Sequence, residues 1–143
     1  MPGTPPPARR TVLRAVAIAP AAGLGITACS SGGDGGGTST SAPTAPVDLG
    51  ASDDVKVGAS ELYLDENVVV SRISDDQYKA FSTICTHRQC PINKLEGHKL
   101  ICPCHGSQFD ATNGKVLHDP AVAPLHELSV KVENGKIVAG PKA

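Results

Sequence analysis

The sequence predicts an all-β domain over residues 47–143. Short apolar or alternating runs recur along this region, and turn-forming residues separate them. No stretch of it repeats apolar residues at helical spacing, so small antiparallel sheets are expected. The 97 residues from 47 to 143 are the length of one domain.

The expected strands are runs of three to five residues. In chain order they are Val55–Val57, Glu61–Leu64, Val68–Arg72, Tyr78–Phe81, Gln108–Asp110, Lys115–Leu117, Ser129–Val132 and Lys136–Val138. Asn134-Gly135 joins the last two as a hairpin, and Asn113-Gly114 is a similar turn signal. With no Trp, two Phe and two Tyr, the core is expected to be aliphatic and modest.

Two short motifs in the middle of the chain predict a metal centre. They are Cys85-Thr86-His87 and Cys102-Pro103-Cys104-His105-Gly106-Ser107. Each supplies one thiolate and one imidazole, the ligand set of a two-iron, two-sulfur cluster in which histidines replace two cysteines. At these residues the chain resembles the Rieske iron-sulfur proteins. The resemblance covers most of 47–139 and implies a Rieske-type antiparallel β-sandwich with a cluster-binding subdomain inserted after Phe81.

The resemblance also implies that Cys85 and Cys102 bind one iron of a [2Fe-2S] cluster, and that His87 and His105 bind the other, near solvent. Two ferric ions and two sulfides carry +2, so four thiolates give −2, whereas two thiolates and two neutral imidazoles give zero. An electron enters the less negative centre more readily. Such clusters have potentials of roughly −150 to +300 mV, against about −400 mV for all-cysteine plant-type clusters.

Two further cysteines, Cys90 and Cys104, lie within the same loops. In the branch of the family found in quinol-oxidising complexes, a disulfide between these positions ties the loops together, so the resemblance implies a Cys90–Cys104 bond. Ring-hydroxylating oxygenases of the family carry an aromatic residue in place of Cys104. Arg88, directly after His87, resembles the oxygenase pattern and replaces a leucine that shields the cluster in quinol-oxidising members. It argues against quinol docking.

Three more positions bear on the reduction potential. Ser107 matches a family serine whose hydroxyl donates to a bridging sulfide, which stabilises the reduced cluster. Phe109 stands where high-potential members have a tyrosine that donates to a cysteine ligand, which predicts a lower potential; it also fits plain core packing. Asp119 stands where the family's proline loop usually begins with glycine. Its carboxylate disfavours reduction if it faces the cluster and does almost nothing if it faces solvent.

Zinc is the alternative metal, because two cysteines and two histidines also suit a tetrahedral site. Structural zinc sites usually place like ligands two to four residues apart, which this chain does not do. The remaining histidines, His98, His118 and His126, are expected to be surface residues. No catalytic constellation appears elsewhere, so the domain is expected to relay electrons rather than act as a stand-alone enzyme.

The first 28 residues predict an export signal. They hold three arginines and no acidic residue, followed by an apolar run of 14 residues, Ala15–Ala28. This run is shorter than the ~18 to 20 residues needed to cross a bilayer, so an N-terminal membrane helix is the second interpretation. Arg9-Arg10-Thr11-Val12-Leu13-Arg14 resembles a twin-arginine signal, the route that exports folded proteins.

Ile26-Thr27-Ala28-Cys29 resembles a bacterial lipobox, in which the cysteine is acylated and begins the mature protein. The alternative is an ordinary signal cut near Ala28. Removing Cys29 from the five cysteines leaves two for iron and two for a disulfide, so none is unpaired. After Cys29, the segment up to residue 46 is Gly, Ser, Thr, Ala and Pro apart from Asp34, which predicts a flexible tether over 29–46.

These features predict a lipid-anchored one-electron carrier of the bacterial cell envelope, at the outer face of the cytoplasmic membrane. Its partner would be a redox protein or membrane oxidoreductase. The second hypothesis is the iron-sulfur subunit of a quinol-oxidising, cytochrome bc-type complex, and the third is a zinc-stabilised binding lipoprotein. Without the three signal arginines, 10 basic and 14 acidic residues give a net charge of −4, and no basic patch predicts nucleic-acid binding.

Overall fold

The computed structural model describes residues 40–143. The predicted export signal at 1–28, the predicted lipidation site Cys29 and the predicted tether up to residue 39 lie outside the described residues. Within 40–143 the regular structure consists of ten β-strands and one short 3-10 turn. No helix in this part of the chain is long and apolar enough to span a membrane.

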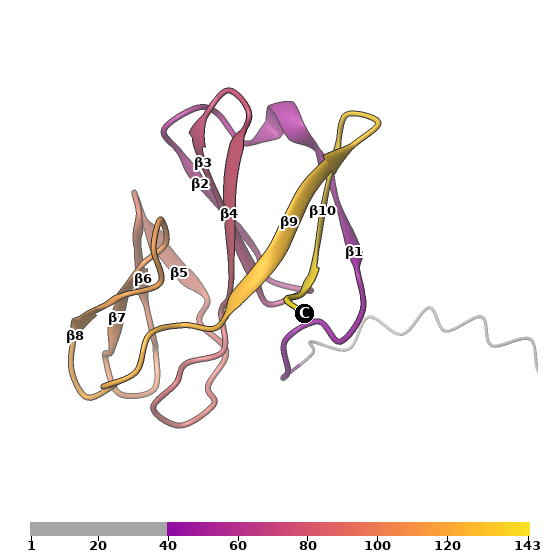
Figure 1. The fold of residues 1–143 in the computed structure, drawn as a ribbon. Coiled ribbons are helices and arrows are strands. Elements are labelled where there is room, and N and C mark those ends of the chain that lie inside the picture. Colours follow the sequence, from indigo (N-terminus) through magenta and orange to yellow (C-terminus); the bar gives the residue numbers. More distant parts are fainter. Residues whose placement is uncertain (1–39) are drawn as a thin grey trace, which may run out of the picture. The chain divides into compact units, whose positions relative to one another are not determined.

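Six strands form a large antiparallel sheet in the order β1-β10-β9-β4-β3-β2 (Figure 1). Their bounds are Val47–Ala51 (β1), Ser60–Tyr63 (β2), Val68–Ser74 (β3), Gln77–Ser82 (β4), Glu127–Glu133 (β9) and Lys136–Pro141 (β10). The 3-10 turn, Ser52–Asp54, follows β1 directly. Asn134-Gly135 joins β9 to β10, as predicted for this hairpin.

The large sheet folds into a sandwich because its two middle strands pair only briefly. β4 and β9 share two residue pairs, Ala80 with Leu128 and Phe81 with Glu127, and then diverge (Figure 1). The halves β2–β3–β4 and β1–β10–β9 therefore face each other across a common core. Its buried residues are Leu49, Val55, Val68, Val70, Ala80, Leu128, Ile137 and Ala139. The predicted all-β sandwich is confirmed.

A small antiparallel sheet in the order β5-β6-β7-β8 is inserted between β4 and β9. Its strands are Lys94–Glu96 (β5), Lys99–Ile101 (β6), Gln108–Asp110 (β7) and Val116–His118 (β8). It packs on a second core, whose buried residues are Val69, Phe81, Cys85, Ile92, Leu100, Cys102, Phe109, Ala111, Ala121 and Leu125. The subdomain predicted to follow Phe81 is therefore present.

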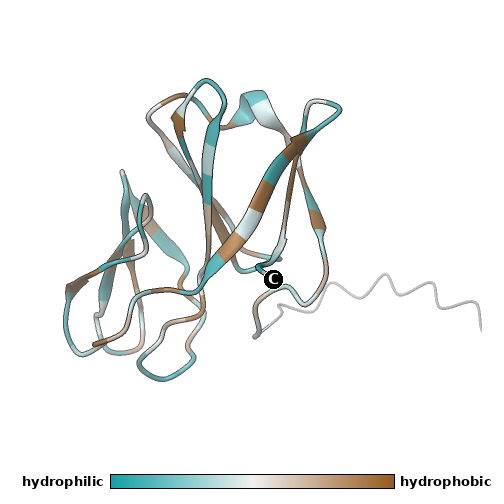
Figure 2. Ribbon diagram, viewed as in Figure 1, coloured by the Kyte–Doolittle hydropathy of each residue, from teal (hydrophilic) through white to brown (hydrophobic). Residues whose placement is uncertain are grey.

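The strand β3 lies between the two cores, which explains its unbroken apolar run. Val68 and Val70 belong to the sandwich core, whereas Val69 points to the other face and joins the second core. Successive side chains of a strand point to opposite faces, and here each face of β3 is covered by a core. All three side chains are therefore fully buried. In contrast, β9 alternates between hydrophobic and hydrophilic residues along its length (Figure 2), as expected for a strand with one face in solvent.

The segment Val55–Val57 was predicted as a strand, and this prediction is wrong. It follows the 3-10 turn and leads into a turn at Gly58, which has a φ of +75°. Val55 is buried in the sandwich core, but Val57 is 52% exposed, so the apolar run reflects one buried side chain rather than a strand. Three strands, β1, β5 and β6, were not predicted.

The end of the predicted tether is held against the domain. Nδ2 of Asn67 donates to the carbonyl oxygen of Ser41 at 3.1 Å. The backbone of Pro46 lies so close to Gly140 that a Cβ at Gly140 would come within 3.0 Å of it. Within the described residues, the last part of the predicted tether, from Ser41 to Pro46, thus contacts the domain at both of its ends.

Candidate metal centre

The two cysteine–histidine motifs fold into two loops with the same backbone frame. In the first loop, Cys85–Cys90, the Cys85 amide donates to the Cys90 carbonyl at 2.8 Å, and the Gln89 amide donates to the Cys85 carbonyl at 2.9 Å. In the second loop, Cys102–Ser107, the amide of Cys102 donates to the carbonyl of Ser107 at 2.8 Å. The Gly106 amide donates back to Cys102 at 3.1 Å. Each loop is thus a six-residue turn closed on its own first cysteine.

The loops bring all four predicted ligands together. Cys85 and Cys102 are free thiols, 1% and 2% exposed, and they are close enough for the Cys85 thiol to raise the pKa of the Cys102 thiol. The rings of His87 and His105 meet edge to face, with their centres 4.8 Å apart. His87 is half-buried and His105 is exposed, so the imidazole side of the site is the one nearer solvent.

The donor set fits a cluster ligated by two thiolates and two imidazoles. Nδ1 of His87 is buried, and no hydrogen-bond partner for it exists among residues 40–143. A buried nitrogen without a partner is costly, so its acceptor or metal is expected to come from outside the protein chain. Burial is the main cause that raises the pKa of the Cys102 thiol; a backbone hydrogen bond from Cys104 opposes it, and the Cys85 thiol raises it further. A metal ion would instead bind both thiols as thiolates.

A disulfide joins the two loops. Cys90 and Cys104 are bonded, with their Cα atoms 6.5 Å apart, as the family resemblance implied. Both sulfurs lie within 4.8 Å of the sulfur of Cys102. Because Cys90 and Cys104 are bonded to each other, Cys85 and Cys102 are the free thiols of the described chain.

Ser107 ends the second loop, two residues after His105. Its side chain is fully buried, and Oγ accepts a hydrogen bond from the Ala121 amide at 3.0 Å. Within residues 40–143 no acceptor takes the hydroxyl's own proton, so that proton is available to the site.

The loop at 119–124 is the predicted proline loop, and it is tied to the cysteine loops at two points. Ala121 donates to Ser107, and the hydroxyl of Thr86 donates to the carbonyl oxygen of Ala123 at 2.6 Å. The side chain of Val122 at its tip is 92% exposed. The role of Thr86 was not predicted, because its partner lies 37 residues away in the sequence.

The three remaining candidates occupy different environments. Phe109 is fully buried in the second core, together with Cys85 and Cys102, so its packing role is clear. Arg88 and Asp119 are both exposed. A carboxylate in solvent is screened, which favours the interpretation in which Asp119 has little influence on the cluster.

The three other histidines are exposed, as predicted. One of them nevertheless makes a specific contact: Nδ1 of His98 lies 2.7 Å from Oγ of Ser60. Nothing in the sequence indicated it, because the two residues are 38 positions apart.

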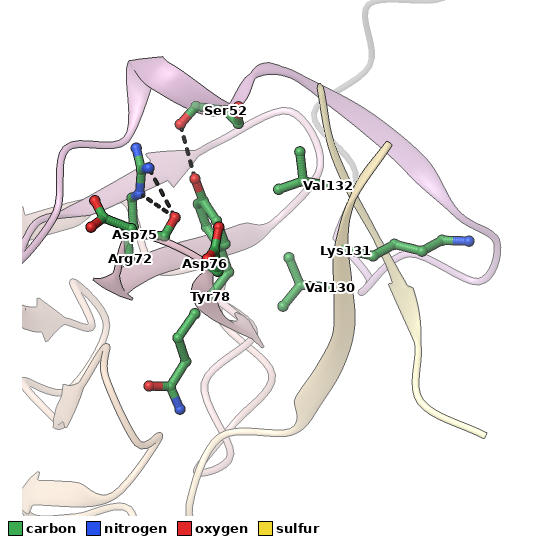
Figure 3. Close-up of a pocket in the computed structure, with 9 residues that line it drawn as sticks. Ser52, Arg72, Asp75, Asp76, Tyr78, Val130, Lys131 and Val132 are labelled. Atoms are coloured by element: carbon green, nitrogen blue, oxygen red, sulfur yellow. Dashed lines mark hydrogen bonds between the residues drawn. The ribbon is translucent and has the colours of Figure 1, made fainter. Parts of the chain in front are cut away.

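A hollow of about 520 Å³ opens where β4 and β9 diverge (Figure 3). None of the four predicted ligands lines it. The guanidinium of Arg72 is already used there: it donates to the carbonyl oxygens of Asp75 and Val55 and lies 5.3 Å from the centre of the Tyr78 ring. The other cation on its lining, Lys131, is paired with Glu133 at 2.6 Å. Both cations of the lining are thus engaged, and the hollow is separate from the metal centre.

Comparisons with known proteins agree with the geometry. The sequence model of the Rieske [2Fe-2S] domain matches residues 45–140. The cytochrome b6-f complex iron-sulfur subunit of Chlorobaculum tepidum is 37% identical over 93 residues, which cover 63% of this chain and 50% of that protein. The cytochrome bc1 complex Rieske iron-sulfur subunit of Corynebacterium diphtheriae is 40% identical over 84 residues, 52% of this chain and 21% of that protein. This chain thus spans half or less of the length of these relatives.

A solved structure gives the same result. The plasma membrane Rieske protein of the cyanobacterium Synechocystis PCC 6803 is 35% identical and superposes with a TM-score of 0.53, over 68% of this chain and 99% of that one. The match of the family model over most of the chain, together with the paired loops, shows that the protein belongs to the Rieske [2Fe-2S] domain family, whose cofactor is a two-iron, two-sulfur cluster.

Proposed function

We propose that this protein is a one-electron carrier in which Cys85 and Cys102 bind one iron of a [2Fe-2S] cluster and His87 and His105 bind the other. The observation that carries the proposal is the convergence of two buried free thiols and two adjacent imidazoles from equivalent loops. When bound, the cluster supplies a site that gains and loses a single electron.

The residues around the site keep the cluster in place and restrict access to it. Burial of Cys85 and Cys102 excludes water from the thiolate side, whereas His105 faces solvent and supplies the short path for an electron. The four protein ligands complete the coordination of both irons, so no position opens for a substrate. The domain is therefore a relay rather than a stand-alone enzyme.

The proposed partner is a membrane-bound redox protein. The curated relatives named above are subunits of cytochrome b6-f and bc1 complexes, which supports a partner of that kind. Quinol oxidation within such a complex is the second candidate, and the Cys90–Cys104 disulfide favours it. Arg88 and Phe109 argue against it, because both depart from the quinol-oxidising pattern.

Stopped-flow mixing of the oxidised protein with a short-chain quinol separates the two candidates. A carrier of electrons between proteins is expected to be reduced slowly, at a rate proportional to quinol concentration. For a quinol-binding subunit, the reduction rate would saturate with quinol concentration. Arg88→Leu would then lower the quinol concentration at which the rate saturates. A protein that shows no reversible one-electron wave in film voltammetry would contradict both candidates.

We also propose that the protein is exported by the twin-arginine route and anchored through a lipid on Cys29 at the outer face of the cytoplasmic membrane. The support is the sequence Arg9-Arg10 and the Cys29 lipobox. Mass spectrometry of the mature protein is expected to find an acylated Cys29 at its amino terminus. An unmodified Cys29, or a chain that still begins at Met1 and stays in the membrane, would instead support an ordinary signal or a membrane helix.

A further inference from the structure

A line of polar groups connects the small sheet to the large sheet and returns to the small one. Nδ1 of His98, in the turn between β5 and β6, lies 2.7 Å from Oγ of Ser60 in β2. The same Oγ lies 2.6 Å from Oγ of Ser71 in β3. The Ser71 hydroxyl donates to the carbonyl oxygen of Ala111, directly after β7, at 2.7 Å.

The direction of this line follows from the number of protons. Each serine hydroxyl has one proton to donate, and a carbonyl oxygen only accepts, so the Ser71 proton goes to Ala111. The proton between the two serines must then come from Ser60. Ser60 has none left for the imidazole, so Nδ1 of His98 must carry a proton and donate it. Neutral histidine protonated on Nδ1 and charged histidine both satisfy this requirement.

The proton count also excludes a nucleophilic serine. Ser60 and His98 line a hollow of about 320 Å³, and a serine within hydrogen-bonding reach of a histidine is the arrangement of an activated nucleophile. Activation requires the serine to donate its proton to the imidazole. Here the serine proton is directed to Ser71, so the contact is structural.

The line ends on a residue that is held from both sides. The Ala111 carbonyl accepts from Ser71, and the Ala111 amide donates to the His98 carbonyl at 2.7 Å. Ala111 is fully buried in the same core as Cys85 and Cys102. Only the three residues of β7 separate it from Ser107.

We propose that the His98–Ser60–Ser71 line, here called the latch, fixes the small sheet on the large sheet and, through Ala111 and β7, holds Ser107 in position. His98 is a positioning residue in this scheme, because it acts through the two serines and touches none of the four ligands. The latch stands on its own geometry, whereas its effect on the reduction potential rests on the proposed function of Ser107.

Two substitutions of similar size test the direction of the proton. In His98→Asn the amide can still donate to Ser60, whereas in His98→Asp the carboxylate can only accept. A third variant, Ser60→Ala, breaks the latch without adding charge. Ser60→Ala is needed because a charge at residue 98 acts on the nearby carboxyl of Asp110. Burial raises the pKa of Asp110, but hydrogen bonds from Thr112 and Asn113 and the charge of His98 lower it overall.

The measurements use the full-length, cluster-loaded protein. Hydrogen–deuterium exchange, read by mass spectrometry in a peptide covering 108–112, reports on the Ala111 amide. We expect exchange roughly fivefold faster in His98→Asp and Ser60→Ala, the factor for one lost hydrogen bond, and unchanged exchange in His98→Asn. The reduction potential from film voltammetry is expected to fall in the same two variants, because a displaced Ser107 stabilises the reduced state less.

Several outcomes would overturn the proposal. Unchanged exchange in Ser60→Ala would refute the latch. If the Ala111 amide stayed protected from exchange in His98→Asp and lost protection in His98→Asn, Ser60 would be the donor to residue 98 rather than the acceptor. Faster exchange at an unchanged potential would refute the positioning of Ser107. A protein with no voltammetric wave would refute the proposed function, and the exchange data would still decide the latch.

Discussion

The two metal-binding loops have the same backbone and a different order of side chains. In both, the first residue is a free cysteine whose amide and carbonyl close the turn, and the fifth residue has a left-handed backbone. The histidine comes third in the first loop and fourth in the second. The disulfide cysteine comes sixth in the first loop and third in the second.

The difference between the loops lies in what fills the left-handed position. Gly106 occupies it in the second loop, with a φ of +80°, at no steric cost. Gln89 occupies it in the first loop, with a φ of +57°, where a side chain costs roughly 1 to 2 kcal/mol. The first loop therefore stores strain that the second does not. The backbone frame and the free cysteine are thus the shared requirement, and the remaining positions are adapted separately in each loop.

The largest expected effect tests the equivalence of the loops. Cys85→Ser and Cys102→Ser should each abolish cluster assembly, because each removes one of the two thiolates proposed to bind the same iron. Iron and sulfide analysis is expected to fall from two of each per chain to near zero in both variants. The circular dichroism of the large sheet should persist, since its sandwich core contains neither cysteine. A variant that keeps a full cluster would contradict the assignment of that ligand.

The next largest expected effect is a loss of stability on removal of the disulfide, which links the two loops. The bonded cysteines are 14 residues apart, and a loop of that size is worth about 3 kcal/mol by chain entropy. The double variant Cys90→Ser/Cys104→Ser should lose about that free energy of unfolding in denaturant titrations. Ile137→Val in the sandwich core, a control remote from both loops, should cost about 1 kcal/mol. A double variant no less stable than this control would show that the disulfide contributes little to the free energy of unfolding.

The left-handed position predicts two changes of opposite sign. Gln89→Gly should stabilise the protein by about 0.5 to 1 kcal/mol, because relief of strain exceeds the added entropy of the unfolded chain. Gly106→Ala should destabilise it by about 1 kcal/mol; a Cβ there meets no atom within 4 Å, so backbone conformation is the only penalty. Melting temperatures and denaturant midpoints measure both. Equal signs for the two variants would contradict the comparison.

The smallest expected effect on stability concerns the strand that follows the second loop. Phe109→Tyr adds a hydroxyl within the core that also contains Cys85 and Cys102, and donation from it to a proposed cysteine ligand would favour the reduced cluster. The reduction potential should rise in film voltammetry, while stability changes little. Ile92→Val, a change in the same core after the first loop, should leave the potential unchanged. A Phe109→Tyr potential at or below the original value would remove the tuning role of this position.

The predicted strands are those with a visible apolar or alternating run, whether or not a side chain is fully buried; β2 and β8, for example, contain no buried residue. β3, β4, β9 and β10 are apolar or alternating runs, and their hairpin turn is marked by Asn134-Gly135. β5 was missed because its one apolar residue, Leu95, lies between the charged Lys94 and Glu96. β6 was missed because its apolar part is only two residues long, Leu100 and Ile101. The strand predicted at Val55–Val57 was wrong because a single buried valine beside a turn resembles the start of a strand.

The site was predictable where its parts are close in the sequence. The thiols, imidazoles and disulfide cysteines fall within two short motifs, so the family resemblance could bring them together. The strain at Gln89 was not visible, because no residue type marks a left-handed backbone as glycine does at Gly106. The contacts of Thr86 with Ala123 and of His98 with Ser60 join distant segments, so only the folded chain shows them.

Electron paramagnetic resonance of the reduced, full-length protein is the sharpest test of the proposed cluster and its ligands. We expect the signal of one unpaired electron on a two-iron cluster, with hyperfine coupling to nitrogen from two imidazoles; His87→Cys and His105→Cys should each remove the coupling of one of them. A zinc protein would be silent. A cluster signal without nitrogen coupling would show that His87 and His105 are not ligands and would refute the proposed ligand set.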